Sequence, residues 1–419
     1  MADWIKVNLG ELAAEGRSVI SGPFGSDIGT QFFKSEGVPV IRGNNLTKDH
    51  RRLVDDGFVF VTEDKADDLD AYAVEDDLIF TAAGTIGQVG LIPEGSRFEK
   101  YVISNKQIRF RADLSKVDLD YLYAWLSSPW IFRAIENRDT GSTVPLINLS
   151  VVRSLPVSLP KSGAEQRKIG RIFRAIDAKI ELNNRINAEL EALAKMIYDY
   201  WFVQFDFPDA HGRPYKSSGG AMVWNDTLKH EIPAGWEAGV LSDIAKITMG
   251  QSPAGDSYNE EGRGAVFFQG STDFGARSPN VRMYTTSPGR MAWEGDILVS
   301  VRAPVGTLNI ADRTCCIGRG LAALHSKNGF DGYLHRVLAD LKQIFDRRSS
   351  EGTTFGSINK DDLFGLRVLI PDVHALRAYE RMACNWIRMA ALRDKESREF
   401  TQLRDWLLPL LMNGQVRVA

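Results

Sequence analysis

An internal repeat constrains the fold of this chain more than any other feature of its sequence. The segment Gly141–Asn148 reads GSTVPLIN, and about 210 residues later Gly352–Asn359 reads GTTFGSIN. Further upstream, Val40–Asn45 matches Phe267–Thr272 in the same order. Two copies are too few for a solenoid, which stacks three or more units. The repeat therefore predicts two similar domains related by a pseudo-twofold axis.

Within each copy, the first ~150 residues consist of short β-rich runs separated by glycine, proline and asparagine, a pattern typical of strands joined by turns. Helical patterns interrupt these runs at residues 119–135 and 332–347. We expect strands at Val38–Arg42, Asp77–Thr81, Gln107–Arg111, Val266–Gln269 and Asp296–Val301. Each copy is therefore predicted to be a mixed α+β domain.

Each copy then ends in a predicted helix of unusual length. The first runs from Glu165 to about Phe202 without proline, and the second follows Pro371. At 1.5 Å per residue each would be roughly 55–60 Å long, which is too long for its apolar seam to be buried within one small domain. We therefore expect the two helices to pair as a long antiparallel two-helix coiled coil between the domains. Its predicted interface residues recur at spacings of three and four: Ile169, Phe173, Ile176, Ile180, Leu190, Ile197, Trp201, Tyr379, Met382, Trp386, Met389, Phe400, Leu403 and Leu407.

Polar residues interrupt both seams near the middle. Asn183 and Asn187 interrupt the first seam, and Arg393 and Glu396 interrupt the second. Antiparallel pairing would bring these residues together, and polar residues at seam positions can fix the register at some cost in stability. The alternative is that they face solvent where the helices diverge.

These patterns divide the chain into five expected segments. They are a first globular domain (1–160), a long helix (161–205), a turn-rich connector (206–235), a second globular domain (236–371) and a long C-terminal helix (372–419).

The charge balance is close to neutral. The chain carries 51 Lys+Arg and 54 Asp+Glu, a net charge of −3, and the run Asp55–Asp77 alone holds ten carboxylates and one lysine. Nucleic-acid binding usually shows a basic patch, so the overall charge supports it poorly. It does not exclude it, since an acidic face can point away from DNA while a basic face contacts it.

Motifs for catalysis, metal binding and membrane insertion are missing. The sequence has no GxxxxGK[ST] phosphate loop, no GxSxG elbow and no run of 18 apolar residues. Its three cysteines, Cys315, Cys316 and Cys384, form no disulfide framework, and the six histidines show no paired spacing for zinc. We therefore predict a cytoplasmic binding protein with no catalytic residues, no metal site and no membrane segment.

Several segments resemble the specificity (S) subunits of type I restriction–modification systems. These segments are Ser21–Ser26, the two Gly-Ser/Thr-Thr…Ile-Asn repeats, Glu165-Gln166, Phe205–Pro208, Gly212–Gly220 and Ile232–Glu237. The resemblance covers essentially the whole chain, including its duplicated layout. The second long helix departs from the pattern, because Ala375-Leu-Arg377 stands where a Glu-Gln pair opens the first.

The resemblance implies a division of labour. Each globular domain would be a target-recognition domain that reads one half of a bipartite double-stranded DNA target. The long helices would space the two domains and dock two methyltransferase (M) subunits, which methylate adenine N6 with S-adenosylmethionine. Cleavage, with ATP and Mg, would belong to restriction (R) subunits that join the complex of two M subunits with one S subunit. This chain would hold no cofactor of its own.

The two copies differ at positions suited to base recognition, so the two half-sites should differ in sequence. Arginine can read guanine, and asparagine or glutamine can read adenine. The predicted DNA-binding residues are Arg42, Asn44, Asn45, Thr85, Lys106, Ser142, Gln269, Ser271, Thr272, Arg302, Arg319 and Thr353. For each of them the alternative is a turn-forming role or a phosphate contact.

Three other functions stay open from the sequence. One is a specificity subunit of a related bipartite system in which a single partner chain both methylates and cleaves. The second is a single-chain methyltransferase or nuclease. The third is a coiled-coil scaffold whose globular domains bind protein.

Overall fold

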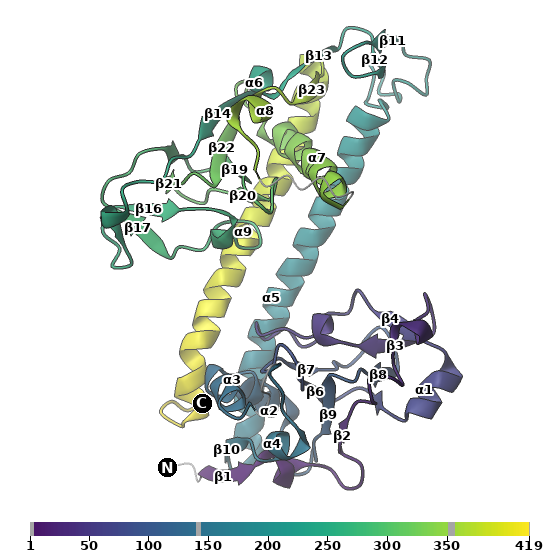
Figure 1. The fold of residues 1–419 in the computed structure, drawn as a ribbon, viewed down its shortest axis with the longest axis vertical. Coiled ribbons are helices and arrows are strands. Elements are labelled where there is room, and N and C mark those ends of the chain that lie inside the picture. Colours follow the sequence, from purple (N-terminus) through teal and green to yellow (C-terminus); the bar gives the residue numbers. More distant parts are fainter. Residues whose placement is uncertain (1–3, 140–143, 351–356, 419) are drawn as a thin grey trace. The chain divides into compact units, whose positions relative to one another are not determined.

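A computed structural model describes residues 4–139, 144–350 and 357–418. The chain divides into two compact units (Figure 1). The first unit contains Met1–Leu182 and Ser397–Ala419, and the second contains Asn183–Glu396. Each unit therefore combines a globular α+β domain with part of both long helices.

The first unit builds its domain on two four-stranded sheets. One sheet has the order β2 (Val19–Ser21), β9 (Gln107–Arg111), β6 (Asp77–Thr81), β7 (Val89–Leu91), and the other has the order β4 (Val59–Val61), β3 (Val38–Ile41), β8 (Tyr101–Ile103), β5 (Tyr72–Ala73). Strands β3 and β8 are parallel, and the other neighbours are antiparallel. A separate antiparallel pair joins β1 (Trp4–Asn8) to β10 (Pro156–Pro160).

Four short helices complete this domain: α1 (Glu63–Leu69), α2 (Leu119–Leu126), α3 (Pro129–Glu136) and α4 (Leu149–Arg153). The single helix expected over 119–135 is wrong, because the chain breaks it into α2 and α3. Ser128 caps α3 by accepting a hydrogen bond from the amide of Ile131 at 3.4 Å. Pro129 then occupies the first turn, where its missing N–H costs nothing.

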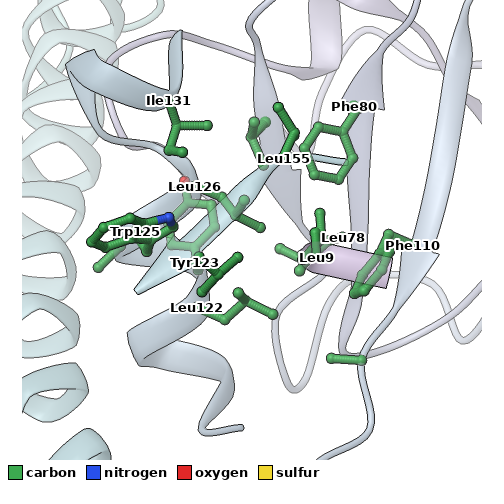
Figure 2. Packing of buried hydrophobic residues seen from close by; sticks show 14 of the residues in the cluster. Leu9, Leu78, Phe80, Phe110, Leu122, Tyr123, Trp125, Leu126, Ile131 and Leu155 are labelled. Atoms are coloured by element: carbon green, nitrogen blue, oxygen red, sulfur yellow. The ribbon is translucent and has the colours of Figure 1, made fainter. Parts of the chain in front are cut away.

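The core of the first unit lies between the sheet β2-β9-β6-β7 and these helices. Figure 2 shows Leu78, Phe80 and Phe110 from the strands facing Leu122 and Leu126 of α2. Residues from both long helices close the same core, including Phe173 and Leu408, which are 2% and 1% exposed. The apolar ends of the long helices thus belong to the core of this domain.

The second unit repeats this arrangement strand for strand. One sheet has the order β14 (Ala245–Met249), β22 (Leu321–Ser326), β19 (Ile297–Ser300), β20 (Leu308–Ile310). The other has the order β15 (Tyr258–Asn259), β17 (Met283–Thr285), β16 (Ala265–Phe268), β21 (Cys315–Ile317), β18 (Met291–Ala292). Again one neighbouring pair, β16 and β21, is parallel, and β13 (Glu237–Val240) pairs separately with β23 (Arg367–Ile370). The second unit therefore has the strand order of the first, with β15 added at one edge.

The helices of the second domain are α6 (Leu241–Ile244), α7 (Asp331–Ser350) and α8 (Lys360–Phe364). Before it, the connector carries a hairpin of β11 (Met222–Asn225) and β12 (His230–Pro233). An aromatic cluster anchors the connector, since Phe207 stacks between Tyr215 and Trp236 with ring centroids 4.7 Å from each.

Two long helices pass through the units. Helix α5 (Gly163–Tyr198) has 36 residues and continues into a π-helical turn at Asp199–Val203, while α9 (Val373–Met412) has 40 residues. In the second unit, Asn183 Nδ2 donates to Glu396 Oε2 at 2.9 Å and Asn187 Nδ2 donates to the carbonyl of Ala390 at 3.3 Å. Residue numbers rise along one helix as they fall along the other, so the two helices are antiparallel within this unit.

The face that α9 buries differs from the expected one. Met389 and Leu403, both predicted interface residues, are 39% and 41% exposed, whereas their neighbours Ala390 and Arg404 are 4% and 5% exposed. Ala383 and Ser397 follow the same seven-residue spacing and are also buried. The expected seam follows the largest apolar residues, but small side chains let the helix backbones approach closely, and Arg404 is buried because it has polar partners.

Candidate nucleic-acid interface

In the first unit, four strand ends meet at the turn between β8 and β9. The ends of β3 and β8 are adjacent because these strands are parallel, and the ends of β2 and β6 both adjoin the start of β9. The amides of Ser104, Gly22 and Ala82 donate to the carbonyls of Ile41, Gln107 and Lys106 at 3.0, 2.9 and 2.7 Å, respectively. The turn therefore holds together the loops that follow all four strands.

A fifth segment joins these loops. The amide of Ile147 donates to the carbonyl of Ala82 at 2.8 Å, and the amide of Gly84 donates to the carbonyl of Pro145 at 2.9 Å. We call the assembled surface rim 1, which comprises residues 22–26, 42–46, 82–87, 104–106 and 144–147.

The second unit forms an equivalent surface around the turn between β21 and β22. The amides of Gly318, Gly250 and Val301 donate to the carbonyls of Phe268, Leu321 and Gly320 at 2.8, 2.9 and 2.9 Å, respectively. The amide of Ile358 donates to the carbonyl of Val301 at 2.8 Å. We call this surface rim 2, which comprises residues 250–254, 269–273, 301–306, 318–320 and 357–358.

Glycine is required where the first loop of each rim crosses the central turn. A Cβ atom at Gly22 would lie 1.9 Å from the carbonyl oxygen of Ser104, and one at Gly250 would lie 2.1 Å from that of Gly318. Because the obstacle is backbone in both cases, a side chain at either position would force the loop off the turn.

The predicted site residues fall almost entirely on the two rims. On rim 1, Asn44, Thr85 and Lys106 are exposed and Arg42 is half-buried. On rim 2, Gln269, Thr272, Arg302 and Arg319 are exposed and Ser271 is half-buried. Ser142 and Thr353 lie outside the described residues. The structure thus brings together side chains that are far apart in the sequence, separately within each unit.

Asn45 is placed differently from the other predicted residues. Its side chain is 0% exposed, accepts a hydrogen bond from the amide of Arg42 at 3.0 Å, and donates to the carbonyls of Val54 and Asp56 at 3.1 and 2.9 Å. A saturated, buried amide has no free edge to offer a base, so the structure gives Asn45 a loop-forming role in place of the predicted base contact.

The residue equivalent to Asn45 in rim 2 is Asp273, which sequence alignment of the repeat missed. Asp273 is 7% exposed, and its Oδ2 accepts from the amide of Gln269 at 2.8 Å, as Asn45 accepts from Arg42. The loop of rim 2 has one extra residue, so the gapless match of Asn45 to Thr272 is wrong by one position. Because Asp273 takes the capping position, the side chain of Thr272 stays exposed.

The antiparallel pairing of β3 and β4 places part of the acidic run away from rim 1, whereas Asp55 and Asp56 stay beside it, where the carbonyl of Asp56 accepts from Asn45 Nδ2 at 2.9 Å. Val61, the end of β4, pairs with Val38, the start of β3. Helix α1 follows β4 directly and carries Glu63, Asp64, Asp67 and Asp68. These carboxylates therefore lie at the opposite edge of the sheet from Arg42 and Lys106.

A buried polar cluster attaches the first domain to the long helices. Arg404 of α9 lies 3.3 Å from Asp177 of α5 and donates to the carbonyl of Asp49 at 3.3 Å. Burial raises the pKa of Asp177 to about 6, although Arg404 opposes the shift. Burial, with Arg404 nearby, lowers the pKa of His50 to about 3. The loop 47–54 is thus attached to both helices through buried polar and charged side chains.

The second domain is attached by a different set of residues. Arg277 Nη2 donates to the carbonyl of Asn187 at 3.2 Å and pairs with Glu191 at 2.9 Å, both on α5. Ser278 Oγ donates to Asp394 of α9 at 3.0 Å. Adjacent residues of one loop therefore hold both helices within this unit.

Comparison with known proteins shows what the chain is similar to. A family model described as the type I restriction modification DNA specificity domain matches residues 1–192. The chain is 28% identical over 368 residues to a protein of Methanocaldococcus jannaschii that carries the name MjaX specificity subunit of a type I restriction enzyme, covering 86% of this chain and 83% of that protein. It is 24% identical over 355 residues to the MjaIX specificity subunit of the same organism, covering 81% and 78%.

The chain is thus similar to the specificity subunits of type I restriction–modification systems, in residues 1–192 by the family model and over most of its length by these two relatives. Its fold is similar to a crystal structure of a type I S subunit from M. genitalium, with a TM-score of 0.58, 15% sequence identity, and coverage of 98% of this chain and 96% of that chain.

The chain also exposes two matching apolar stripes. In the second unit, the end of α5 and its π-helical turn expose Leu193, Met196, Tyr200 and Val203, with exposed fractions of 38%, 61%, 38% and 56%. In the first unit, the end of α9 exposes Leu403 and Trp406, at 41% and 64%. Leu403 and Trp406 are three residues apart, as are Leu193 and Met196. The two pairs are separated in the sequence by the length of one repeat. We call these surfaces the α5 stripe and the α9 stripe.

Among residues 4–139, 144–350 and 357–418, no group of His, Cys, Asp and Glu side chains is arranged to hold a metal ion. In the same part of the chain, every helix is too short or too polar to cross a membrane.

Proposed function

We propose that this chain is the specificity subunit, the non-catalytic DNA-reading component, of a type I restriction–modification complex, and that each rim reads one half of a bipartite, asymmetric target. The observation that carries the proposal is the pair of rims, which share a strand framework but present different side chains. Rim 1 offers Arg42 and Lys106, whereas rim 2 offers Gln269, Arg302 and Arg319. Similar frameworks with unlike side chains suit two half-sites of unlike sequence.

In this proposal α5 and α9 form an antiparallel coiled coil that separates two pseudo-twofold-related recognition domains. The Asn183–Glu396 contact in the second unit and the Arg404–Asp177 pair in the first support it. Polar contacts within an apolar seam allow only one register. A fixed register would in turn set the number of base pairs between the half-sites.

The two stripes are the proposed docking surfaces for two M subunits. Exposed apolar patches on soluble proteins mark contact surfaces, and a duplicated patch suits two copies of one partner. S-adenosylmethionine would then be bound by the M subunits, and ATP and Mg by R subunits that join the complex of two M subunits with this chain. Such a complex acts on cellular DNA, which implies a cytoplasmic location.

Mapping of N6-methyladenine in cells that express this chain with its cognate methyltransferase tests the proposal. We expect one bipartite, asymmetric motif, and we expect the purified chain alone to transfer no methyl group from labelled S-adenosylmethionine. The variant Gln269→Ala should relax a base in one half-site and leave the other unchanged, while the exposed control Gln402→Ala on α9 should change neither. An uninterrupted motif, or methyl transfer by the chain alone, would contradict the proposal.

A further inference from the structure

We propose that Phe24 is an apolar wedge that inserts against a base step in the half-site read by rim 1, and that rim 2 has no such wedge. This inference rests on the proposed function and adds a mode of recognition that base hydrogen bonding does not supply.

The exposure of Phe24 is the first observation. Its side chain is 82% exposed, the highest exposed fraction among the large apolar side chains of the described residues, ahead of Trp406 at 64%. A phenyl ring that is exposed to water at the tip of a loop adds little to the stability of the fold, because its apolar surface is not buried. The ring is therefore available to a partner.

The loop that carries Phe24 is held rigidly, which is the second observation. Gly22 crosses the backbone of Ser104, and a Cβ at Gly25 would lie 3.0 Å from Nδ2 of Asn105, so the β8–β9 turn supports the loop on both sides of Phe24. The amide of Asp27 donates to the carbonyl of Phe24 at 2.9 Å, and Ile28 is buried. A wedge needs this support, because a loose ring would fold back onto the protein instead of entering the base stack.

Cations at the supporting turn favour DNA as the partner, which is the third observation. The turn carries the exposed Lys106, and Arg42 lies on the same rim, while the carboxylates of α1 lie at the other edge of the sheet. The exposed carboxylates close to the rim are Asp27, in the same loop, and Asp55 and Asp56, which precede Gly57, the residue whose carbonyl accepts from Arg42. Cations around an exposed aromatic ring suit a phosphate backbone on both sides of a base step. An apolar protein segment would leave those cations unpaired.

Rim 2 lacks the ring, although it has the same loop. Gly250 occupies the place of Gly22, and the amide of Ser257 donates to the carbonyl of Ala254 at 3.0 Å, as the amide of Asp27 donates to that of Phe24. Ala254 therefore occupies the place of Phe24 in the turn. Its methyl group is too small to enter a base step, so insertion is expected in one half-site only.

The test measures binding of the assembled complex to a fluorescent duplex that carries the methylated motif. Phe24→Ala should weaken binding about 10- to 100-fold, because an aromatic ring stacked on a base contributes that much, and Phe24→Trp should restore most of the affinity. Leu114→Ala is the matched control, since Leu114 is 56% exposed in the same domain and follows the far end of β9. Its affinity should not change.

A second measurement distinguishes a wedge from a simple surface contact. A single mispair is placed at each step of each half-site in turn. For Phe24→Ala, a mispair at one step of the rim 1 half-site should recover at least about 5-fold in affinity, because the mispair removes the unstacking cost that the wedge offsets. Unchanged binding of Phe24→Ala, or no recovery at any step, would overturn the inference while leaving the proposed function intact. Failure of the wild-type complex to bind the duplex would overturn the proposed function itself.

Discussion

Arg404 and Asp177 form an ion pair at 3.3 Å within the first unit, and both side chains are nearly buried, at 6% and 10% exposed. Each member of the pair is the residue next to a predicted interface residue, Ile176 or Leu403, and Arg404 also donates to the backbone carbonyl of Asp49 in the first domain. It therefore joins α5, α9 and the first domain at one point.

Removal of one partner should be costly at this point. Arg404→Ala removes the cation that lowers the pKa of Asp177, so the buried carboxyl loses its partner and is driven toward its protonated form. We expect a loss of about 1–3 kcal/mol in the unfolding free energy of the first unit, because a buried polar group is left without its hydrogen-bond partner. The double variant Asp177→Leu/Arg404→Met should recover most of it. Urea denaturation followed by circular dichroism measures both. Arg388→Ala, an exposed arginine on the same helix, is the control and should change stability by less than about 0.5 kcal/mol.

Acid should affect the same cluster through His50 and Asp177 in opposite directions. His50 has a pKa of about 3 when folded and 6.5 when unfolded, so acidification through this window protonates the unfolded chain and lowers stability. Asp177 has a pKa of about 6 when folded and 3.8 when unfolded, so acidification through that window protonates the folded chain and raises stability.

Single variants separate these two contributions. His50→Asn, which tolerates the positive φ of 65° at this position, should retain more stability than wild type as the pH falls from about 6.5 to about 4.5, by on the order of 2 kcal/mol. Asp177→Asn should retain less. Urea midpoints at three pH values give, for each variant, the change in stability relative to wild type as the pH falls. A change of the same sign in both variants would contradict the opposite contributions of His50 and Asp177.

Asn183 should be important for the helix pairing of the second unit. Its side chain is 1% exposed and donates to Glu396 at 2.9 Å. This burial excludes the alternative that Asn183 faces solvent. Asn183→Ala should lower the unfolding free energy by about 1–2 kcal/mol, because Glu396 loses a donor that water does not replace. Asn184→Ala, exposed on the adjacent position, should have little effect, and an equal loss in both variants would argue against a specific contact.

The stripes should each hold one M subunit. Met196→Glu places a charge in the α5 stripe and Trp406→Glu places one in the α9 stripe, and a buried unpaired charge weakens such an interface about 100-fold or more. Native mass spectrometry should show two M subunits on wild type, one on each single variant and none on the double variant. Val223→Glu on the exposed β11 strand is the control. Loss of both M subunits from one single variant would contradict independent docking.

Exposed side chains on the rims should differ in what they contribute to binding. Arg42→Ala should cost about 1–3 kcal/mol and relax one base position of a single half-site, whereas Lys106→Ala should weaken all sequences alike and reduce the salt dependence of log K by about one. Methylome sequencing and binding at several salt concentrations distinguish the two outcomes. An unchanged motif with Arg42→Ala would remove it from the reading residues.

Local sequence signals predicted much of the architecture. Strands β6 and β9 have the expected bounds, Asp77–Thr81 and Gln107–Arg111, because alternation and flanking turns mark a strand without reference to its partners. The length of α5 followed from the absence of proline between Glu165 and Phe202, whereas α9 continues through Pro409. Phe24, between Pro23 and Gly25, was visible in the sequence, but nothing local showed that its loop would lie against the β8–β9 turn.

By itself, the sequence determined that there are two copies of one unit, their α+β character and two long helices, because these follow from periodicity and repetition along the chain. Only the tertiary structure decided which residues of each pattern face a partner. It buried Asn45 and Arg404, exposed Met389 and Leu403, and collected each rim around a single turn. Burial depends on contacts between residues distant in sequence, and neighbouring positions on a helix or loop differ too little in local signal to reveal which of them makes those contacts.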